Sequence, residues 1–469
     1  MVFAKSFLKV HIMQKMAIHY PYFMLARICA VVILGFFALS SFAAEKGELS
    51  VGAARVDITP AADAALPMEG YDNRTEGFEK IHDHIYVRTI VLNDGTNSAA
   101  ILAWELIGMP TAVWQNLSQR ISKELGIPAD NLILAGEHVH SAPAVGAYAK
   151  TSPNTNAYIT KLEDAAFEAV RQAKANLQPA RFGLGTGKAY INVNRREFFP
   201  KQGWWWLGYN PDGPSDKTVS VLKFESLSGK PIALFINYSV HGVVMGQDNL
   251  EISGDLPGAT SRYVEQYYEG KEDKRDDAGW DLQLDPQEKT DEKEVVALWT
   301  SGPAGDQNPI VMDSGEDFTM ADGLGRILGE ETVRVANNIT SMSSEAKIRG
   351  DQQVITCPGR KPEAGPFPRK VYKFEDSDPV NIRLSLLMLN KIALAGVSGE
   401  VLTPIYQRLQ KESSSDETIM VTHTNGVSGY IPNDAAYDQI SYEITATSLK
   451  PGCAEVKIVN GFLDMMKQP

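Results

Sequence analysis

The feature that most constrains the fold of this chain is the alternation of short β-branched apolar runs with segments of helical periodicity, from Leu49 onward. Strands are expected at 87–92, 99–104, 132–135, 219–224, 233–238, 296–300, 382–389 and 392–397, and helices at 110–125, 158–177, 258–268 and 323–338. Short turns at Asn93-Asp94-Gly95 and Asn390-Lys391 predict antiparallel hairpins. Hairpins interleaved with helices predict an α/β fold in which mixed β-sheets are flanked by helices.

The length of 469 residues has room for one large domain or two medium ones, and the 43% hydrophobic content supplies a sizeable core. We expect a single large domain over residues 45–469. Segment 269–294 is crowded with Asp, Glu and Lys and holds little apolar content. It is therefore predicted to be a solvated surface insertion within that domain and not a linker between two domains.

The first 44 residues have the pattern of a secretory signal peptide. Lys15 and Arg27 precede an apolar run at 28–39, and small residues follow, with cleavage expected near Ala43 or Ala44. The alternative is an uncleaved anchor helix, but the run is shorter than the ~20 residues that span a bilayer. We therefore expect an exported protein, either periplasmic or secreted.

Cysteine usage is sparse. Cys29 lies inside the expected signal peptide, which leaves Cys357 and Cys453 in the mature chain. An oxidising compartment would allow these two to form a disulfide, and the alternative is a pair of buried free thiols. Two cysteines cannot build a zinc site alone.

The charge balance excludes one class of partner. Lys and Arg total 45 against 58 Asp and Glu, which gives a formal net charge of −13. A chain of this charge repels polyphosphates and offers no basic surface of the kind that nucleic-acid-binding proteins use. Nucleic acid is therefore not expected as a partner.

The segment 198–209 concentrates aromatic residues. Phe198, Phe199, Tyr209 and the run Trp204-Trp205-Trp206 occur with Gly and Pro, and consecutive aromatics do not fit one face of a helix or strand. We expect a loop from which some of these rings project. The rings would either pack onto the domain or form a wall that faces a substrate.

Two histidines mark the first candidate site, in Glu137-His138-Val139-His140-Ser141. His138 and His140 are two residues apart, so their side chains lie on one side of an extended backbone, at the carboxyl end of the strand 132–135. Catalytic residues often occupy such strand ends. These histidines are either metal ligands or ordinary structural residues, and a catalytic zinc also needs about three protein ligands.

Two more polar side chains follow predicted strands. His241 comes after the strand 233–238, and Glu400 comes after the strand 392–397. A carboxylate buried at a strand end needs a charge partner. Each residue alone is more typical of a structural role, but their recurrence at strand ends favours a shared metal site with His138.

The order of several short motifs resembles the catalytic domain of the neutral/alkaline ceramidases. The motifs are Val51-Gly52-Ala53-Ala54-Arg55-Val56-Asp57-Ile58-Thr59-Pro60, His138-Val139-His140-Ser141-Ala142-Pro143, Val240-His241, Ser253-Gly254-Asp255, Gly305-Asp306-Gln307-Asn308-Pro309, Gly399-Glu400 and Gly429-Tyr430-Ile431-Pro432. The resemblance extends from about Val51 to Glu443. It implies a single catalytic domain, in a short form that ends at Pro469 without the family's immunoglobulin-like carboxyl-terminal domain.

The resemblance also implies a site. One zinc ion per chain would be held by His138, His241, Glu400 and Tyr430. His140 would lie beside the zinc-bound water and move protons, Tyr442 would face the scissile amide, and Arg195 would contact the substrate. This division is chemically coherent, because zinc lowers the pKa of bound water toward ~7 and an imidazole of pKa ~6.5 can take up and return a proton.

The chain departs from the family pattern at two places. Asn308 stands where the ceramidases carry a serine that is proposed to take part in catalysis, and Pro432-Asn433 replaces a Thr-Thr pair after Tyr430. Asn308 cannot act as a nucleophile, although its amide can orient a substrate or a water molecule. Attack by zinc-bound water remains available.

We therefore expect a zinc-dependent amidohydrolase that cleaves an N-acyl bond in a small amphipathic, ceramide-like substrate, with the three consecutive tryptophans lining the approach. Such a substrate would bring transient contact with a membrane surface. The replacement at Asn308 favours an alternative in which the bond is an ester, a lactone or a glycan-linked group. A third reading is a non-catalytic zinc-binding or ligand-binding relative, and the oligomeric state is left open.

Overall fold

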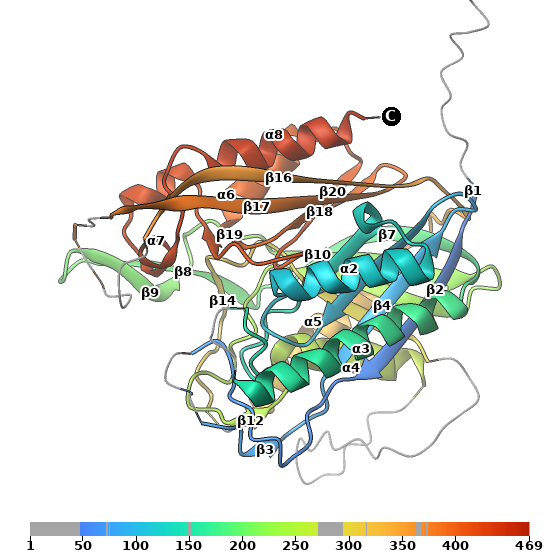
Figure 1. Cartoon of the computed structure of the whole chain (residues 1–469), viewed down its shortest axis with the longest axis horizontal. Coiled ribbons are helices and arrows are strands. Elements are labelled where there is room, and N and C mark those ends of the chain that lie inside the picture. Colours follow the sequence, from blue (N-terminus) through green and yellow to red (C-terminus); the bar gives the residue numbers. More distant parts are fainter. Residues whose placement is uncertain are drawn as a thin grey trace, which may run out of the picture. The chain divides into compact units, whose positions relative to one another are not determined.

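A mixed sheet of eight strands lies at the centre of the described part of the chain, with the strand order β13-β11-β10-β7-β2-β4-β5-β6 (Figure 1). The structure is a computed structural model that describes residues 47–71, 74, 76–147, 152–270, 294–315, 317–361, 368, 370–371 and 374–468. The predicted signal peptide and nearly all of the predicted insertion at 269–294 lie outside the described residues.

The strands of this sheet are β2 (Ser50–Asp57), β4 (Tyr86–Asn93), β5 (Ser98–Trp104), β6 (Leu132–Gly136), β7 (Gln178–Lys188), β10 (Thr218–Ser226), β11 (Pro231–Tyr238) and β13 (Val296–Ser301). The pairs β5–β6 and β11–β13 are parallel, and the other pairs are antiparallel. The predicted hairpin across Asn93-Asp94-Gly95 is confirmed as β4–β5.

Helices cover one face of this sheet. They are α2 (Thr111–Leu125), α3 (Pro153–Ala175), α4 (Asp255–Tyr268) and α5 (Thr319–Asn337). The first two share one hydrophobic cluster with β4, β5 and β6, and the last two share another with β10, β11 and β13. Local signals fix the helix ends: the Ser152 side chain accepts a hydrogen bond from the Thr155 N–H at the start of α3, and α2 ends at Gly126 in the left-handed region.

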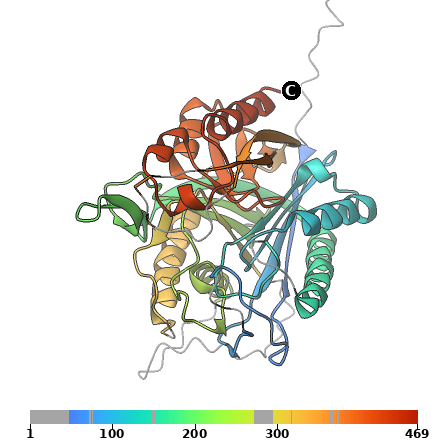
Figure 2. The same ribbon diagram turned by 60° about the vertical axis from the view of Figure 1, so that its left-hand side comes forward.

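A second sheet covers the opposite face. Its strands, in order, are β16 (Ile348–Arg360), β17 (Asp376–Leu389), β18 (Ile392–Val397) and β20 (Glu417–Val421), with β18 and β20 parallel. Helices α6 (Thr403–Glu412) and α8 (Ala454–Met466) pack on its outer face. The result is four layers, helices, sheet, sheet and helices, which Figures 1 and 2 show from two sides.

Alternation along the strands builds the cores between these layers. In β5, Ile101 and Ala103 enter the core between the two sheets, whereas Leu102 and Trp104 face α2 and α3. All four side chains are fully buried. A strand buried on both faces must be apolar at every position, which is why these runs carry no polar alternation. The predicted α/β class with mixed sheets and flanking helices is confirmed.

Short elements complete the fold. They are β1 (Gly47–Glu48), β3 (Lys80–Ile81), β12 (Glu251–Ile252), β15 (Glu345–Ala346), β19 (Glu400–Val401), β21 (Tyr430–Ile431), α7 (Tyr442–Ala446) and the 3-10 turns 129–131 and 434–438. A disulfide joins Cys357 at the end of β16 to Cys453 just before α8, so the pairing left open by the sequence is present. None of the described helices has the length and apolar content that crossing a membrane requires.

The aromatic segment forms a β-hairpin, so the prediction of a loop was wrong. Strands β8 (Asn192–Phe199) and β9 (Trp204–Asn210) pair antiparallel, and β14 (Gln307–Pro309) extends them to a three-stranded sheet. In Figure 1 the hairpin extends away from the layered sheets at the left. Both of its faces are partly exposed, so large rings are tolerated on alternate sides, and no single apolar face is needed.

Candidate metal centre

The predicted site residues converge where parallel strand pairs end. His138 follows β6, His241 follows β11, and Glu400 follows β18. The two histidine loops are joined by backbone hydrogen bonds from the His140 N–H to the Gly242 carbonyl at 3.0 Å and from the Gly242 N–H to the His138 carbonyl at 3.3 Å. Ligands often bind beyond the carboxyl ends of strands in α/β folds, and here those ends come from both sheets.

Backbone carbonyls fix the orientation of two imidazole rings. His138 Nδ1 lies 2.9 Å from the Ile107 carbonyl oxygen, and His241 Nδ1 lies 3.0 Å from the Gln307 carbonyl oxygen. A carbonyl can only accept, so both Nδ1 atoms carry the proton and donate. In the neutral form of each ring, Nε2 is then the atom that offers an electron pair, which is the arrangement found when a histidine binds a metal.

Glu400 adds a carboxylate oxygen to the two imidazole nitrogens. Its Oε2 lies 3.4 Å from His138 Nε2 and 3.3 Å from His241 Nε2. Glu400 is buried, and within the described part of the chain Oε2 has no hydrogen-bond partner. Two imidazole nitrogens and a carboxylate oxygen that face one another in a buried space can hold a cation, and they fit a zinc ion, for which two imidazoles and a carboxylate are typical ligands.

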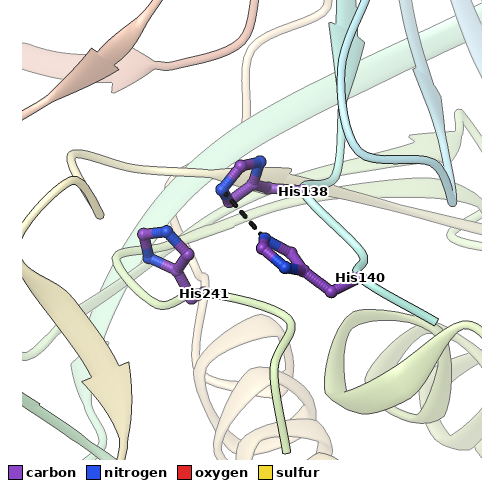
Figure 3. A group of neighbouring side chains, drawn as sticks. All are labelled: His138, His140 and His241. Carbon is purple, nitrogen blue, oxygen red and sulfur yellow. Dashed lines mark hydrogen bonds between the residues drawn. The ribbon is translucent and has the colours of Figure 1, made fainter. Parts of the chain in front are cut away.

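His140 stands next to this donor set (Figure 3). Its Nε2 lies 3.4 Å from His138 Nε2, and ligand atoms of His138, His140 and His241 all lie within 4.8 Å of one another. The ring packs against Gly70, where an added Cβ would come within 2.4 Å of His140 Nδ1. Gly70 also has φ of +115°, so only glycine suits this position.

Burial and neighbouring charges set the protonation states. Burial, with the proximity of His138 and His241, holds the pKa of His140 well below its usual range, and burial with the nearby Arg195 lowers the pKa of His241 to about 4. Burial alone would raise the pKa of Glu400, but its interactions with His138 and His241 keep it well below its ordinary value. His140 and His241 are therefore neutral near neutral pH, and the Glu400 carboxylate is ionised.

Tyr430 lies beside Glu400, because strands β19 and β21 pair in parallel with these two residues in register. Arg195 Nη2 donates to the Tyr430 hydroxyl at 3.1 Å. Burial, followed by the negative charge of Glu400, raises the pKa of the Tyr430 phenol well above its ordinary value. Four residues predicted as zinc ligands, His138, His241, Glu400 and Tyr430, are thus brought to one place.

Arg195 is buried at the junction of the site residues. It donates from Nε to Glu443 at 2.8 Å and from Nη1 to the Asn308 amide oxygen at 3.2 Å, and Nη1 lies 3.3 Å from His241 Nε2. Interaction with Tyr430 and Glu443 outweighs the cost of burial and raises the pKa of the guanidinium, so it remains a cation. The predicted substrate-contacting arginine therefore also anchors the predicted ligand Tyr430.

Tyr442 lies on the outer side of the same group. Its ring centroid is 5.6 Å from that of Tyr430 and 5.9 Å from that of Trp206, both in edge-to-face contact. Trp206, the last of the three consecutive tryptophans, thus contacts a predicted site residue. Asn308, on β14, is buried beside Arg195, so all eight predicted site residues belong to one neighbourhood.

Two residues of this neighbourhood are not identified by the sequence pattern. His423 stacks on His138 with ring centroids 3.9 Å apart and planes 16° apart, and it follows β20 as the predicted site residues follow other strands. Glu443 accepts from Arg195 at a sequence separation of 248 residues. The strand-end position could have indicated His423, whereas no local signal marks Glu443.

His138 and His423 both have a positive φ, 62° and 55° respectively. Such a backbone costs about 1–3 kcal/mol for a residue with a side chain. Hydrogen bonding of the His138 N–H to the Leu106 carbonyl at 3.0 Å, together with the Nδ1 contact, holds the strained conformation. Strain of this kind clusters at functional sites, because it orients a side chain where function needs it.

Comparison with known families gives one match that covers most of the chain. The profile of the family described as "Neutral/alkaline non-lysosomal ceramidase, N-terminal" matches residues 49–358. This range contains the layer of helices, the central sheet and the loops that carry His138, His140 and His241.

Curated relatives have the same family name. The chain is 27% identical to neutral ceramidase 1 of Arabidopsis thaliana over 248 residues, which are 47% of this chain and 30% of that protein. It is 22% identical to neutral ceramidase of Drosophila pseudoobscura pseudoobscura over 405 residues, 75% of this chain and 54% of that protein. The chain therefore matches about a third of the length of the first relative and about half of the second.

Solved structures show the same fold. A structure titled "Ceramidase complexed with C2" superimposes with a TM-score of 0.69 at 17% identity and covers 89% of this chain and 75% of that chain. Neutral ceramidase from Pseudomonas aeruginosa superimposes with a TM-score of 0.67 at 16% identity, and the match covers 90% of this chain and 74% of that chain. The likeness in fold thus extends past residue 358, into the second sheet.

Proposed function

The chain belongs to the neutral/alkaline non-lysosomal ceramidase family, and from this we propose that it is an exported, zinc-dependent amidohydrolase that cleaves the N-acyl bond of ceramide-like lipids. The observation that carries the proposal is the convergence of His138 Nε2 and His241 Nε2 on Glu400 Oε2, at 3.4 and 3.3 Å, while the Nδ1 atom of each ring is held by a backbone carbonyl. Within the proposal, these three atoms and the Tyr430 hydroxyl hold the ion. The donor set suits a catalytic zinc, which keeps a position open.

Zinc, when bound, lowers the pKa of a coordinated water toward about 7 and polarises the carbonyl under attack. Proton transfer is assigned to His140. Its low pKa keeps the ring neutral, its Nε2 faces the donor set, and its Nδ1 has no hydrogen-bond partner within the described part of the chain. A neutral imidazole in this place accepts a proton from water and returns it to the leaving amine.

Arg195 and Tyr442 are assigned to orientation and charge. Arg195 holds Tyr430 through a hydrogen bond and is itself fixed by Glu443, so the ligand tyrosine cannot swing away from the donor set. Tyr442, packed against Tyr430 and Trp206, is placed to donate a hydrogen bond to the oxyanion that develops at the amide carbon. Asn308 has a side-chain amide that orients a substrate or water and supplies no nucleophile.

The nature of the bond is tested with a matched substrate panel. Purified mature chain is incubated with a fluorescent short-chain ceramide, the corresponding fatty ester and an acylated glycan, each with and without a chelator. We expect zinc-dependent release of the fatty acid from the ceramide and loss of turnover in His140→Ala. Zinc-dependent turnover of the ester or the glycan with the ceramide untouched would replace the amidase assignment by the alternative bond.

Export is the part of the proposal that concerns the first 44 residues. Basic residues before an apolar run, followed by small residues, support a cleaved signal peptide. The disulfide between Cys357 and Cys453 also supports an oxidising compartment. Mass spectrometry of the protein from its native host tests this, with an amino terminus after Ala43 or Ala44 expected and an intact amino terminus in the cytoplasm contradicting it.

A further inference from the structure

The β8–β9 hairpin turns alternate residues toward two different places. Arg195 and Trp206 face the metal centre, where they contact the rings of Tyr430 and Tyr442 respectively. Their neighbours in sequence point to the other side of the hairpin, as the period of two in a β-strand requires. On that side they line a separate cavity, which contains Asn194, Arg196 and Trp205.

This cavity has a volume of about 380 Å³, within the roughly 300–1,000 Å³ of small-molecule sites. None of its lining residues belongs to the metal donor set, so it is distinct from the proposed active site. The lining combines amide and charged side chains with small apolar residues and one large aromatic ring. The residues that carry the argument are Asn194, Arg196, Trp205, Asp306, Asn433 and Gln439.

One polar atom in the cavity wall lacks a partner. Asn433 keeps only 9% of its surface exposed, and its Oδ1 is buried with no hydrogen-bond partner within the described part of the chain. A buried acceptor left unsatisfied destabilises the folded state. Since Oδ1 is covered while the cavity is empty, a ligand that turns the Asn433 amide toward the cavity and brings a hydrogen-bond donor to it would remove this cost.

The two buried charged side chains of the wall, Arg196 and Asp306, are already satisfied by the protein. Arg196 donates from Nε to Ser441 at 2.9 Å and from Nη2 to the Ala436 and Gln439 carbonyls at 2.9 and 2.8 Å. The Asp306 carboxylate accepts from the side chains of Asn194, Gln307 and Thr403. The third charged residue of the lining, Asp212, is exposed to solvent. The buried part of the wall therefore offers no unpaired charge to an ionic ligand, whereas a neutral ligand needs none.

The ring of Trp205 supplies the apolar part of the site. Trp205 is half-buried, and its ring centroid lies 5.4 Å from that of Phe198, which supports it from the same face of the hairpin. A long acyl chain would cover the Asn433 amide without supplying the hydrogen-bond donor that its Oδ1 lacks. A sugar ring fits both parts, since its C–H face stacks on an indole and its hydroxyl rim bonds to amides.

We propose that this cavity is a binding site for a neutral saccharide, with one sugar ring stacked on Trp205 and a hydroxyl donating to Asn433 Oδ1. The site is separate from the metal centre and does not depend on the proposed hydrolysis. It gives the chain a means of binding a glycosylated surface or molecule while its active site remains free.

Saturation-transfer NMR on the mature chain tests the site with methyl β-D-glucopyranoside and methyl β-D-galactopyranoside. We expect saturable binding of at least one sugar, weakened at least about tenfold by Trp205→Ala and by Asn433→Leu. Trp204→Ala is the matched control, because Trp204 precedes Trp205 on β9, points to the opposite face and does not line the cavity. It should bind like the wild type.

The two cavity variants make the test robust to misfolding, since either suffices if its melting temperature matches that of the wild type. Absence of saturable binding by both sugars would overturn the proposal. Equal binding by the wild type and folded Trp205→Ala or Asn433→Leu would also overturn it, as would binding of inorganic phosphate in place of the sugars. The measurement needs neither zinc nor turnover, so its failure leaves the hydrolase proposal untouched.

Discussion

At the scale of single residues, His138 and His140 are close in sequence and in space but have different surroundings. His138 is buried, has a left-handed backbone and is oriented by the Ile107 carbonyl. His140 is oriented by packing against Gly70, and its Nδ1 has no hydrogen-bond partner among the described residues. The surroundings of His138 therefore suit a fixed metal ligand, and those of His140 suit a residue that exchanges protons.

We therefore predict that His138→Ala loses bound zinc, whereas His140→Ala retains about one zinc per chain and loses about 10²–10⁴-fold in turnover. Metal content by mass spectrometry and initial rates on a fluorescent ceramide measure both. His84→Ala is the control, since the His84 side chain is 58% exposed and belongs to no part of the site. Equal loss of zinc in His138→Ala and His140→Ala would contradict the division of roles.

Asp255 gives a residue-scale prediction about stability. Burial raises its pKa to about 6 from 3.8, although the N–H groups of Val244, Met245 and Leu256 donate to the carboxylate. The folded state thus binds this proton more tightly than the unfolded state, so stability falls as pH rises between about 4 and 6. Relative to Asp255→Asn, the wild type should lose about 3 kcal/mol across this window.

Urea denaturation of the wild type and Asp255→Asn at several pH values measures this difference. Asp317→Asn is a control with the opposite expectation, because hydrogen bonds from Thr319 lower the pKa of exposed Asp317. A stability difference between wild type and Asp255→Asn that is independent of pH, or that grows with pH, would show that Asp255 is not held at a raised pKa.

At the scale of elements, the sequence predicts well what is decided locally. The expected helix at 110–125 is α2 and the expected hairpin of 382–389 with 392–397 is β17–β18, because apolar periodicity and a two-residue turn specify them within short segments. The β8–β9 hairpin was missed because its rings are accommodated on two partly exposed faces, which leaves no alternation to detect.

The site was predictable to the extent that strand ends and family motifs mark it. Those signals name His138, His241 and Glu400, and the family resemblance adds Tyr430. They do not indicate Glu443, whose contact with Arg195 joins residues 248 apart, nor that β8 separates a second cavity from the metal centre. The contact of Arg195 with Glu443 depends on how the three-stranded sheet that contains β8 packs against α7, and no local sequence pattern encodes that packing.

The disulfide gives a prediction for β16 and α8. It joins residues 96 apart, so it restrains a long loop of the unfolded chain. Replacing both cysteines by alanine should lower the free energy of unfolding by about 2–4 kcal/mol without changing zinc content. Denaturation with and without a reductant tests this: the reductant should destabilise the wild type and leave the double variant unaffected, and an unaffected wild type would contradict the prediction.

At the scale of the whole described unit, the metal centre joins the two sheets. His138 and His241 extend from strands of the central sheet, whereas Glu400 follows a strand of the second sheet. A bound ion would therefore hold the two layers together as well as supply chemistry. A ligand that binds only the folded state raises the free energy of unfolding. The increase is about 2.7 kcal/mol when the free ligand concentration is a hundred times the dissociation constant.

Removal of the ion should thus lower the melting temperature of the wild type by at least about 2 °C, with recovery on addition of zinc. Differential scanning calorimetry with and without a chelator measures the change. The His138→Ala variant is the control, because it lacks a ligand and its melting temperature should not respond. If the melting temperature of the wild type changes with neither chelator nor zinc, the result would argue against an ion between the sheets.

We propose that His138, His241, Glu400 and Tyr430 form a zinc centre in which His140 is not a ligand. Zinc K-edge X-ray absorption on the purified protein identifies the ligands of the ion. We expect about one zinc per chain with two imidazole nitrogens and the remaining ligands oxygen. Absence of zinc, sulfur in its coordination shell, or a third imidazole would show that this ligand set is wrong.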